Sequence, residues 1–223
     1  AGLVEKGQIV MIDGGSTTYE VARNLSQLKR DLTIITNSTG VASVAGANPT
    51  FRVLLCPGTY DSREGSVMGE DTVEFVRRYN ADVAIIGASG LSADGPSDMI
   101  SGAAAVKRAM ISRSLSTVLV VTHDKFGRSS LERICGLDDI ADIVTDSEPK
   151  TDLRTAADET NTALWVSPRR GFELLNLLQY HMALALAPRA SLHGVFMEIF
   201  SIGVLITGEA GAGKSELALE LIS

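Results

Sequence analysis

Short runs of apolar and β-branched residues recur along the first two thirds of the chain, separated by segments whose apolar residues fall at three- and four-residue spacing. The runs predict strands, and the spaced segments predict helices with one buried face. The predicted strands are residues 9–12, 32–36, 51–55, 82–86, 117–122 and 140–145, and the predicted helices are residues 17–28, 71–79 and 103–112. This alternation predicts an α/β fold: an open, mostly parallel sheet with flanking helices.

The pattern changes near residue 147. Residues 148–162 are polar and show no apolar face, so we interpret them as a linker between a first domain, residues 1–147, and a second unit, residues 163–223. In the second unit, residues 171–187 predict an apolar helix, and residues 195–200 and 204–207 predict two strands. These few elements predict a small, partial α/β unit.

Composition and charge narrow the possible functions. The chain is 45% hydrophobic but has no run that is long and apolar enough to span a membrane, which predicts a soluble protein with no membrane partner. A net charge of -7 argues against direct binding to nucleic acid, because DNA binding normally needs a basic face. The two cysteines lack metal-ligand spacing and favour the reducing cytoplasm, and the three histidines lie too far apart in the sequence to predict a metal site.

The most informative polar cluster stands between the first predicted strand and the first predicted helix. Its residues are Asp13, Gly14, Gly15, Ser16, Thr17 and Thr18. Glycines permit the tight turn, and the hydroxyls with the free N–H groups of the first helical turn can hold an anion. A glycine turn followed by an ordinary helix cap explains the same residues equally well.

Similar clusters follow four other predicted strands. They comprise Thr36, Asn37 and Ser38; Gly58; Gly87, Ser89 and Gly90; and Lys125. Because the carboxyl ends of parallel strands meet along one edge, we expect all of these residues at one effector-binding crevice, with Lys125 as a cation for a phosphate. No G-x-G-x-x-G motif follows the first strand, so we expect no nicotinamide cofactor in this domain.

The stretch from about residue 7 to residue 146 resembles the C-terminal sensor domain of DeoR-family transcriptional repressors. The matching pieces are residues 13–18, 36–38, 57–61, 87–91, 105–110, 125–127 and 143–146. The resemblance implies a fold related to ribose-phosphate isomerases and CoA transferases, a phosphorylated sugar or related metabolite as effector, and a role in regulating carbohydrate metabolism. We also expect a homo-oligomer. Thr122 departs from the family pattern, which commonly has an acidic residue there, and Asp124 instead adjoins Lys125.

Two further expectations concern activity. Family members usually carry a winged helix-turn-helix ahead of the sensor domain, so we do not expect this chain alone to bind an operator. An isomerase is the competing interpretation of the first domain, and its general base would be one of the carboxylates of Asp13, Asp61, Asp94 and Asp98. We rank binding above catalysis and assign no catalytic residue.

A phosphate-binding motif lies near the C-terminal end of the sequence. Gly208, Glu209, Ala210, Gly211, Ala212, Gly213, Lys214 and Ser215 match the Walker A pattern G-x-x-x-x-G-K-[ST]. The loop follows a predicted strand and precedes a helical segment, as an ATP site requires. Its backbone N–H groups would hold the phosphates, Lys214 would reach the outer phosphates, and Ser215 would be a ligand to Mg²⁺.

Residues from about 163 to 223 resemble the HPr kinase/phosphorylase family. The matching pieces are residues 193–195, 203–209 and 213–222. The resemblance implies an ATP-dependent kinase that acts on a serine of HPr, the carrier protein of the sugar phosphotransferase system. The sequence stops one short helix after the loop, before the family's catalytic carboxylate, so we expect no catalysis from this segment alone. A natural fusion, an assembly error and a deliberate fusion all account for two families in one chain.

Overall fold

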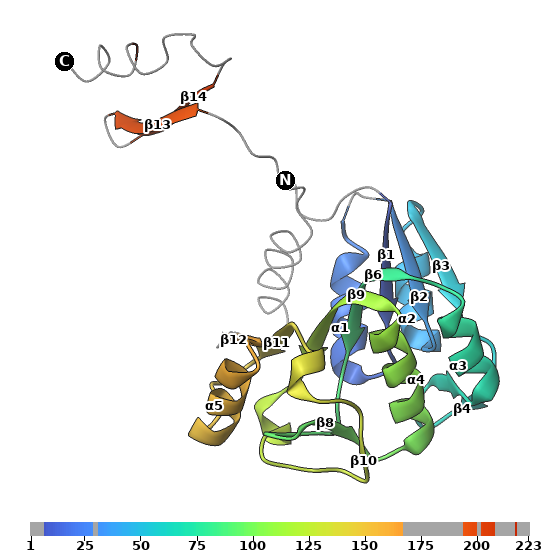
Figure 1. Ribbon diagram of the computed structural model, residues 1–223. Coiled ribbons are helices and arrows are strands. Elements are labelled where there is room, and N and C mark those ends of the chain that lie inside the picture. The colour runs from blue at the N-terminus through green and yellow to red at the C-terminus, as the bar shows by residue number, and fades with distance from the viewer. Residues whose placement is uncertain (1–6, 29–30, 167–193, 200–201, 208–216, 218–223) are drawn as a thin grey trace. The chain divides into compact units, whose positions relative to one another are not determined.

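The computed structural model describes residues 7–28, 31–166, 194–199, 202–207 and 217. The chain divides into two compact units, Ala1–Ala187 and Pro188–Ser223. The first contains a seven-stranded sheet in the order β12-β11-β9-β6-β1-β2-β3, in which every neighbouring pair is parallel (Figure 1). These strands are β1 (Gln8–Ile12), β2 (Leu32–Thr36), β3 (Phe51–Leu55), β6 (Ala81–Ile86), β9 (Ser114–Val120), β11 (Asp142–Thr145) and β12 (Ala163–Val166). The predicted fold class is confirmed.

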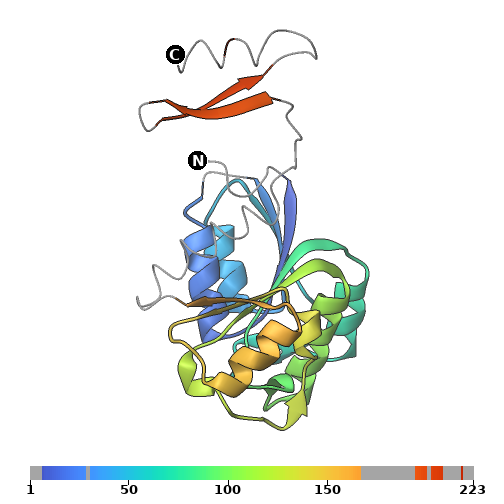
Figure 2. The ribbon, with the colours of Figure 1, turned by 60° about the vertical axis from the view of Figure 1, so that its left-hand side comes forward.

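Helices cover both faces of this sheet, with α1 (Ser16–Leu25) and α2 (Thr39–Gly46) on one face and α3 (Glu70–Arg77) and α4 (Ser101–Ser112) on the other (Figure 2). Alternate residues of a strand therefore enter different cores. In β1, Val10 and Ile12 pack with α1 and α2, while Met11 packs with α3 and α4. Because a shift of one residue would exchange these sets, burial on both faces fixes the strand register.

The order of the strands creates a crevice at the centre of the sheet. From β1 the chain builds outward through β2 and β3, and then returns to the other side of β1 to build outward through β6, β9, β11 and β12. The connections after β1 and β6 therefore diverge, which leaves room beyond the carboxyl ends of these two strands. The two ends stay joined, since Asp13 N–H donates to the Ile85 carbonyl at 3.1 Å.

Several short elements were not predicted. The strands are β4 (Thr59–Asp61), β5 (Ser66–Met68), β7 (Gly90–Ser92), β8 (Gly95–Asp98) and β10 (Glu132–Arg133), and the helices are α2 and the 3-10 turns η1 (His123–Lys125) and η2 (Leu137–Asp139). β4 and β5 form a hairpin, and β7, β8 and β10 form a small separate sheet. Such short elements hold too few residues to show a periodic pattern.

The segment predicted as a linker is folded, so that prediction is wrong. Residues Thr151–Glu159 form α5, and two of its residues, Leu153 and Ala157, are buried on one face of the helix. The chain then enters β12, which pairs with β11 as an edge strand of the main sheet. Two apolar residues among many polar ones gave too weak a pattern to predict a helix from the sequence. The helix forms because burial of these two residues against the rest of the domain stabilises it.

In the second unit the structure describes a two-stranded hairpin. β13 (Gly194–Ile199) pairs antiparallel with β14 (Ile202–Thr207), which confirms the two predicted strands. The predicted helix at residues 171–187 and the Walker A loop at residues 208–215 lie outside the described residues. None of the described helices is long and apolar enough to cross a membrane.

Candidate functional site

A cavity of about 430 Å³ lies at the carboxyl ends of the central strands. This volume is in the range of small-molecule sites. The sequence-predicted effector residues that line it are Asp13, Gly14, Gly15, Ser16, Thr17, Thr18, Asn37, Gly87, Ser89 and Lys125. The residues that were not singled out as effector ligands are Glu64, Ser66, Ala88, Asp98, Ala103, Val106, Lys107, Val121, Thr122 and Asp124.

Four predicted effector residues do not line this cavity. The Thr36 hydroxyl accepts a hydrogen bond from the Ser38 N–H at 3.0 Å, and the Ser38 hydroxyl accepts one from the first turn of α2 at 3.3 Å. Gly58 has a φ of 139°, and a Cβ there would meet a side-chain oxygen of α3 at 2.3 Å. At Gly90 a Cβ would lie 2.5 Å from a backbone carbonyl oxygen. Ser38 thus caps α2, and the two glycines stand where other atoms leave no room for a side chain.

The N-terminus of α1 opens onto the cavity. Its N-cap residue is Gly15, no side chain caps it, and no acidic residue occupies its first turn. The Thr18 hydroxyl lies 3.1 Å from the carbonyl oxygens of both Asp13 and Gly15, which holds the turn before the helix. The first N–H groups of a helix have no partner within it, and the helix dipole favours negative charge there. The turn therefore places the positive end of the α1 dipole on one side of the cavity.

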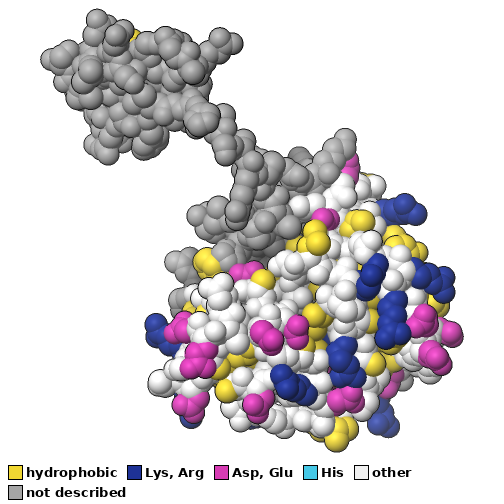
Figure 3. Space-filling view, in the orientation of Figure 1, with side chains coloured by type: hydrophobic (Ala, Val, Ile, Leu, Met, Phe, Trp, Pro, Cys, Tyr) yellow, Lys and Arg dark blue, Asp and Glu magenta, His cyan; other side chains and the backbone are white. Residues whose placement is uncertain are grey.

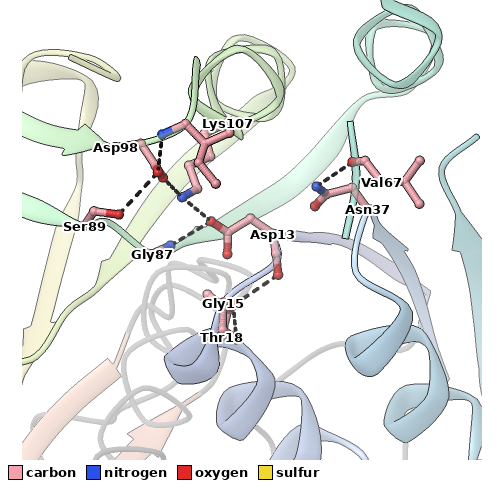
Figure 4. Close-up of polar contacts among 10 residues, drawn as sticks. Asp13, Gly15, Thr18, Asn37, Val67, Gly87, Ser89, Asp98 and Lys107 are labelled. Atoms are coloured by element: carbon pink, nitrogen blue, oxygen red, sulfur yellow. Dashed lines mark hydrogen bonds and ion pairs between the residues drawn. The ribbon is translucent and has the colours of Figure 1, made fainter. Parts of the chain in front are cut away.

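Three charged side chains meet at the inner end of the cavity (Figure 4). The ammonium of Lys107, on α4, lies 3.2 Å from Asp13 Oδ2 and forms a second ion pair with Asp98 Oδ2 on β8. Asp13 Oδ2 also accepts the Gly87 N–H at 3.0 Å, and Asp98 Oδ1 accepts the Ser89 hydroxyl at 3.2 Å. All three charged groups are buried, so one ammonium is shared by two carboxylates in a poorly hydrated place.

Burial and charge act against each other in this cluster. Burial raises the pKa of Asp13 above its ordinary 3.8, and the nearby Lys107 ammonium and the hydrogen bonds to Asp13 only partly offset this effect. Burial also acts to lower the pKa of Lys107, but the carboxylates of Asp13 and Asp98 outweigh it and hold that pKa above 10.5. Lys107 is therefore charged at neutral pH, and two carboxyl groups share its ammonium.

Two buried acceptor atoms in the cavity lining have no hydrogen-bond partner: Asp13 Oδ1 and Asn37 Oδ1. Asp13 is 1% exposed and Asn37 is 3% exposed. The Asn37 amide donates to the Val67 carbonyl at 3.0 Å, which fixes its orientation (Figure 4). Buried polar atoms are nearly always hydrogen-bonded, because an unpaired one loses its hydration without compensation. Asp13 and Asn37 therefore each bring one buried acceptor without a donor to the lining of the cavity.

Lys125, on η1, provides a cation near the opening of the cavity. Its ammonium pairs with Asp124 Oδ2 at 2.9 Å, and the Lys125 side chain is 35% exposed. Asp124 also accepts a hydrogen bond from the Thr122 hydroxyl, and these bonds, the one from Thr122 first, lower its pKa. Asp124 thus pairs with both Thr122 and Lys125. Such exposed pairs are worth at most about 1 kcal/mol, so a ligand anion can displace Asp124 at small cost.

Acidic groups outnumber cations around the cavity. The titratable lining residues are Asp13, Glu64, Asp98, Asp124, Lys107 and Lys125. Because Lys107 is already engaged by two carboxylates, an anion would depend mainly on the backbone N–H groups of α1 and on Lys125. Among the residues that the structure describes, no group of three or more His, Cys, Asp or Glu side chains is placed to hold a metal ion.

Asp98 and Lys107 were not predicted as partners of Asp13. Asp98 was considered only as a catalytic base, since it stands in a four-residue strand that shows no periodicity. Lys107 did carry a signal. It lies within a helix whose Val106, Ala109 and Met110 are buried, and a lysine in such a setting indicates a buried ion pair.

Two families match different parts of the chain. The DeoR C-terminal sensor domain matches residues 1–147, and the HPr serine kinase C-terminal domain matches residues 184–223. Among curated proteins, the HPr kinase/phosphorylase of Xanthomonas campestris pv. campestris (strain B100) is 78% identical over 72 residues, which cover 32% of this chain and 23% of that protein. That of Stenotrophomonas maltophilia (strain R551-3) is 63% identical over 95 residues, 42% of this chain and 30% of that protein. The chain thus spans about a quarter of the length of these relatives.

Solved structures give distant likenesses. Ribose 5-phosphate isomerase A from Methanocaldococcus jannaschii has a TM-score of 0.40 and 15% identity, covering 56% of this chain and 48% of that chain. The eIF2B beta subunit from Chaetomium thermophilum has a TM-score of 0.44 and 16% identity, covering 70% of this chain and 49% of that chain. The family model is the stronger finding. Because it matches residues 1–147 of 223, the chain belongs to the DeoR C-terminal sensor domain family.

Proposed function

We propose that the first unit is the effector-sensing domain of a DeoR-type transcriptional regulator and that its 430 Å³ cavity binds a phosphorylated sugar or a related metabolite. One observation carries this proposal: the uncapped N-terminus of α1 shares a cavity with two unpaired buried acceptors. Backbone N–H groups at a helix N-terminus suit a phosphate, and carboxylate and amide oxygens suit hydroxyls. A sugar phosphate carries both kinds of group on one small molecule.

The charge balance of the cavity is compatible with this ligand. The excess carboxylate lies in the buried cluster of Asp13, Asp98 and Lys107, whereas the α1 N-terminus and Lys125 provide positive potential nearer to solvent. The domain would work in the cytoplasm as a homo-oligomer and report the level of its ligand to a carbohydrate-metabolism gene.

Sensing is a better account of the site than isomerase chemistry. Of the four carboxylates considered as a general base, only Asp13 and Asp98 line the cavity. Asp61 Oδ1 instead accepts a backbone N–H within the β4–β5 turn at 2.8 Å, and Asp94 is exposed. Both remaining carboxylates are ion-paired to Lys107, an arrangement that holds them in place.

Thermal unfolding with a panel of sugar phosphates tests the proposal. Ribose 5-phosphate, fructose 6-phosphate and glucose 6-phosphate are compared with the unphosphorylated sugars. A ligand at about a hundred times its dissociation constant stabilises the fold by roughly 2.7 kcal/mol. Stabilisation by at least one phosphorylated member and not by its parent sugar is expected, and no response from any member would refute the proposal.

Lys125→Ala tests the phosphate contact. Loss of a charged hydrogen bond should weaken binding of the responding sugar phosphate by about 1.5–3 kcal/mol. Lys150→Ala is the matched control, because Lys150 is an exposed lysine outside the cavity lining. Equal affinities for the two variants would remove Lys125 from the site.

A second candidate function rests on the 78% identity to HPr kinase/phosphorylase over 72 residues. We propose that residues 208–215 bind ATP with Mg²⁺, with Lys214 at the outer phosphates and Ser215 at the metal, and that HPr is the partner of this segment. Titration of the chain with a fluorescent ATP analogue in the presence of Mg²⁺ tests the nucleotide site. Binding that persists in Lys214→Ala would contradict it.

A further inference from the structure

The cavity has an inner and an outer layer. Asp13, Asn37, Asp98 and Lys107 are each at most 5% exposed and form the inner layer. The outer layer contains Gly15 and Ser16, which are exposed, and Lys125, which is partly exposed. The inner layer thus presents mainly acceptor oxygens, and the outer layer presents backbone donors and a cation.

Lys107 and Gly87 engage only one oxygen of Asp13. Both donate to Oδ2, whereas Oδ1 has no hydrogen-bond partner, and Asp13 is one of the residues that line the cavity. On the neighbouring strand, the Asn37 amide nitrogen is engaged by Val67 and leaves Oδ1 unpaired in the same way. Lys107 is therefore a positioning residue that prepares the Asp13 acceptor for a ligand.

We propose that the ligand binds with its phosphate in the outer layer and that two of its hydroxyls donate to Asp13 Oδ1 and Asn37 Oδ1. This inference rests on the proposed function and adds the ligand's orientation and class. The cavity would select sugar phosphates that keep unmodified hydroxyls on carbons remote from the phosphate, and would reject their deoxy analogues. A ligand lacking either hydroxyl leaves a buried oxygen unpaired, which costs more than a lost surface contact.

The reverse orientation is disfavoured by charge. A phosphate in the inner layer would approach Asp13 and Asp98, whose negative charge exceeds that of the single Lys107 ammonium. Like charges repel strongly where water is scarce, because the effective dielectric constant is low. In the outer layer a phosphate meets the α1 N-terminus and Lys125, and solvent screens it from the inner carboxylates.

The first experiment uses the unchanged protein. Ribose 5-phosphate, glucose 6-phosphate and fructose 6-phosphate are titrated by calorimetry beside analogues that each lack one hydroxyl, and inorganic phosphate reports on the outer layer alone. For the sugar phosphate that binds, at least one analogue should bind about tenfold or more weakly. Equal affinity for every analogue would overturn the inference while leaving the proposed function intact. If no sugar phosphate binds, the proposed function fails and this inference fails with it.

The second experiment exchanges the acceptor for a donor. In Asp13→Asn the amide oxygen should take the place of Oδ2, because Lys107 and Gly87 donate there, and the NH₂ group would then face the cavity. The ratio of affinities for the sugar phosphate and for inorganic phosphate should fall at least about tenfold. Asp94→Asn, which removes an equal charge at an exposed turn outside the cavity, is the control and should keep the ratio.

One outcome distinguishes orientation from charge, and one further variant tests the second acceptor. If Asp13→Asn binds inorganic phosphate and the sugar phosphate more tightly to the same extent, the phosphate lies near Asp13 and the proposed orientation is wrong. Asn37→Ala tests the second acceptor independently and should lower the same ratio. Thermal unfolding of each variant is measured first, and if Asp13→Asn does not fold, the analogue series and Asn37→Ala decide the question.

Discussion

The buried ammonium of Lys107 gives the sharpest prediction about stability. Replacing it with methionine keeps a long, flexible side chain but removes the charge that Asp13 and Asp98 share. Both carboxylates are then left in a site that is at most 5% exposed. Removing one partner of a buried ion pair typically costs 3–5 kcal/mol, because the remaining charge has no compensation. Small domains have about 5–15 kcal/mol of stability in total, so Lys107→Met should remove a large part of it.

The loss should depend on pH, with a sign that follows from the carboxylates. Burial already raises the pKa of Asp13 in the folded protein, and without Lys107 that pKa should rise further. A group whose pKa is raised on folding stabilises the fold below its unfolded pKa, and this stabilisation is lost as the pH rises through the folded pKa. The deficit of Lys107→Met should therefore be largest above the folded pKa of Asp13 and shrink as the pH falls through that pKa and Asp13 binds a proton.

Urea unfolding provides the measurement. The chain has one tryptophan, Trp165 on β12, whose indole donates to Asp142 at 3.0 Å and so reports on the edge of the main sheet. Circular dichroism in parallel tests whether the transition has two states. Lys125→Met is the control, since its pair with Asp124 is partly exposed and worth less than about 1 kcal/mol. A loss below about 1 kcal/mol at neutral pH, or a loss that does not shrink as the pH is lowered, would refute the reasoning.

Four further predictions follow from local geometry and charge. Gly58→Ala should destabilise the fold by about 1–3 kcal/mol in denaturant unfolding, because the added Cβ would lie 2.3 Å from a side-chain oxygen at a φ of 139°, whereas Gly46→Ala, with no atom within 4 Å, should be neutral or slightly stabilising. Burial raises the pKa of the Cys56 thiol to about 12, so Ellman's reagent should label it at pH 8 only on unfolding; rapid labelling of the native chain would contradict this. Asp124→Asn should tighten binding of the responding sugar phosphate, because Lys125 loses its competing carboxylate, and unchanged calorimetric affinity would exclude that competition. The raised pKa of Lys107 means that its stabilisation is present below pH 10.5 and lost as the pH rises through its folded pKa, so stability measured by urea unfolding should fall more steeply in that range in the native chain than in Lys107→Met.

Local patterns in the sequence determined much of the main sheet. The runs at β1, β2, β6, β9 and β11 are apolar because these strands are covered on both faces, and such runs can be recognised without knowledge of strand order. The glycine turn before α1 could also be predicted from the sequence, because its residue types are those that a tight turn and a helix start require. α5 and β12 were not, because their stability comes from docking on the finished sheet.

The inner layer of the cavity was decided only by tertiary structure. Asp13 accepts a hydrogen bond from the N–H of Gly87, which lies 74 residues further along the chain. Its other partner, Lys107, lies on α4, and α4 follows β6, the strand on the other side of β1 from β2. Periodicity records which face of one element is buried, but it carries no information about which side chains of different elements meet. Sequence therefore determined the fold class and the glycine turn before α1, whereas the shared ammonium and the two unpaired acceptors arise from the order in which the strands assemble.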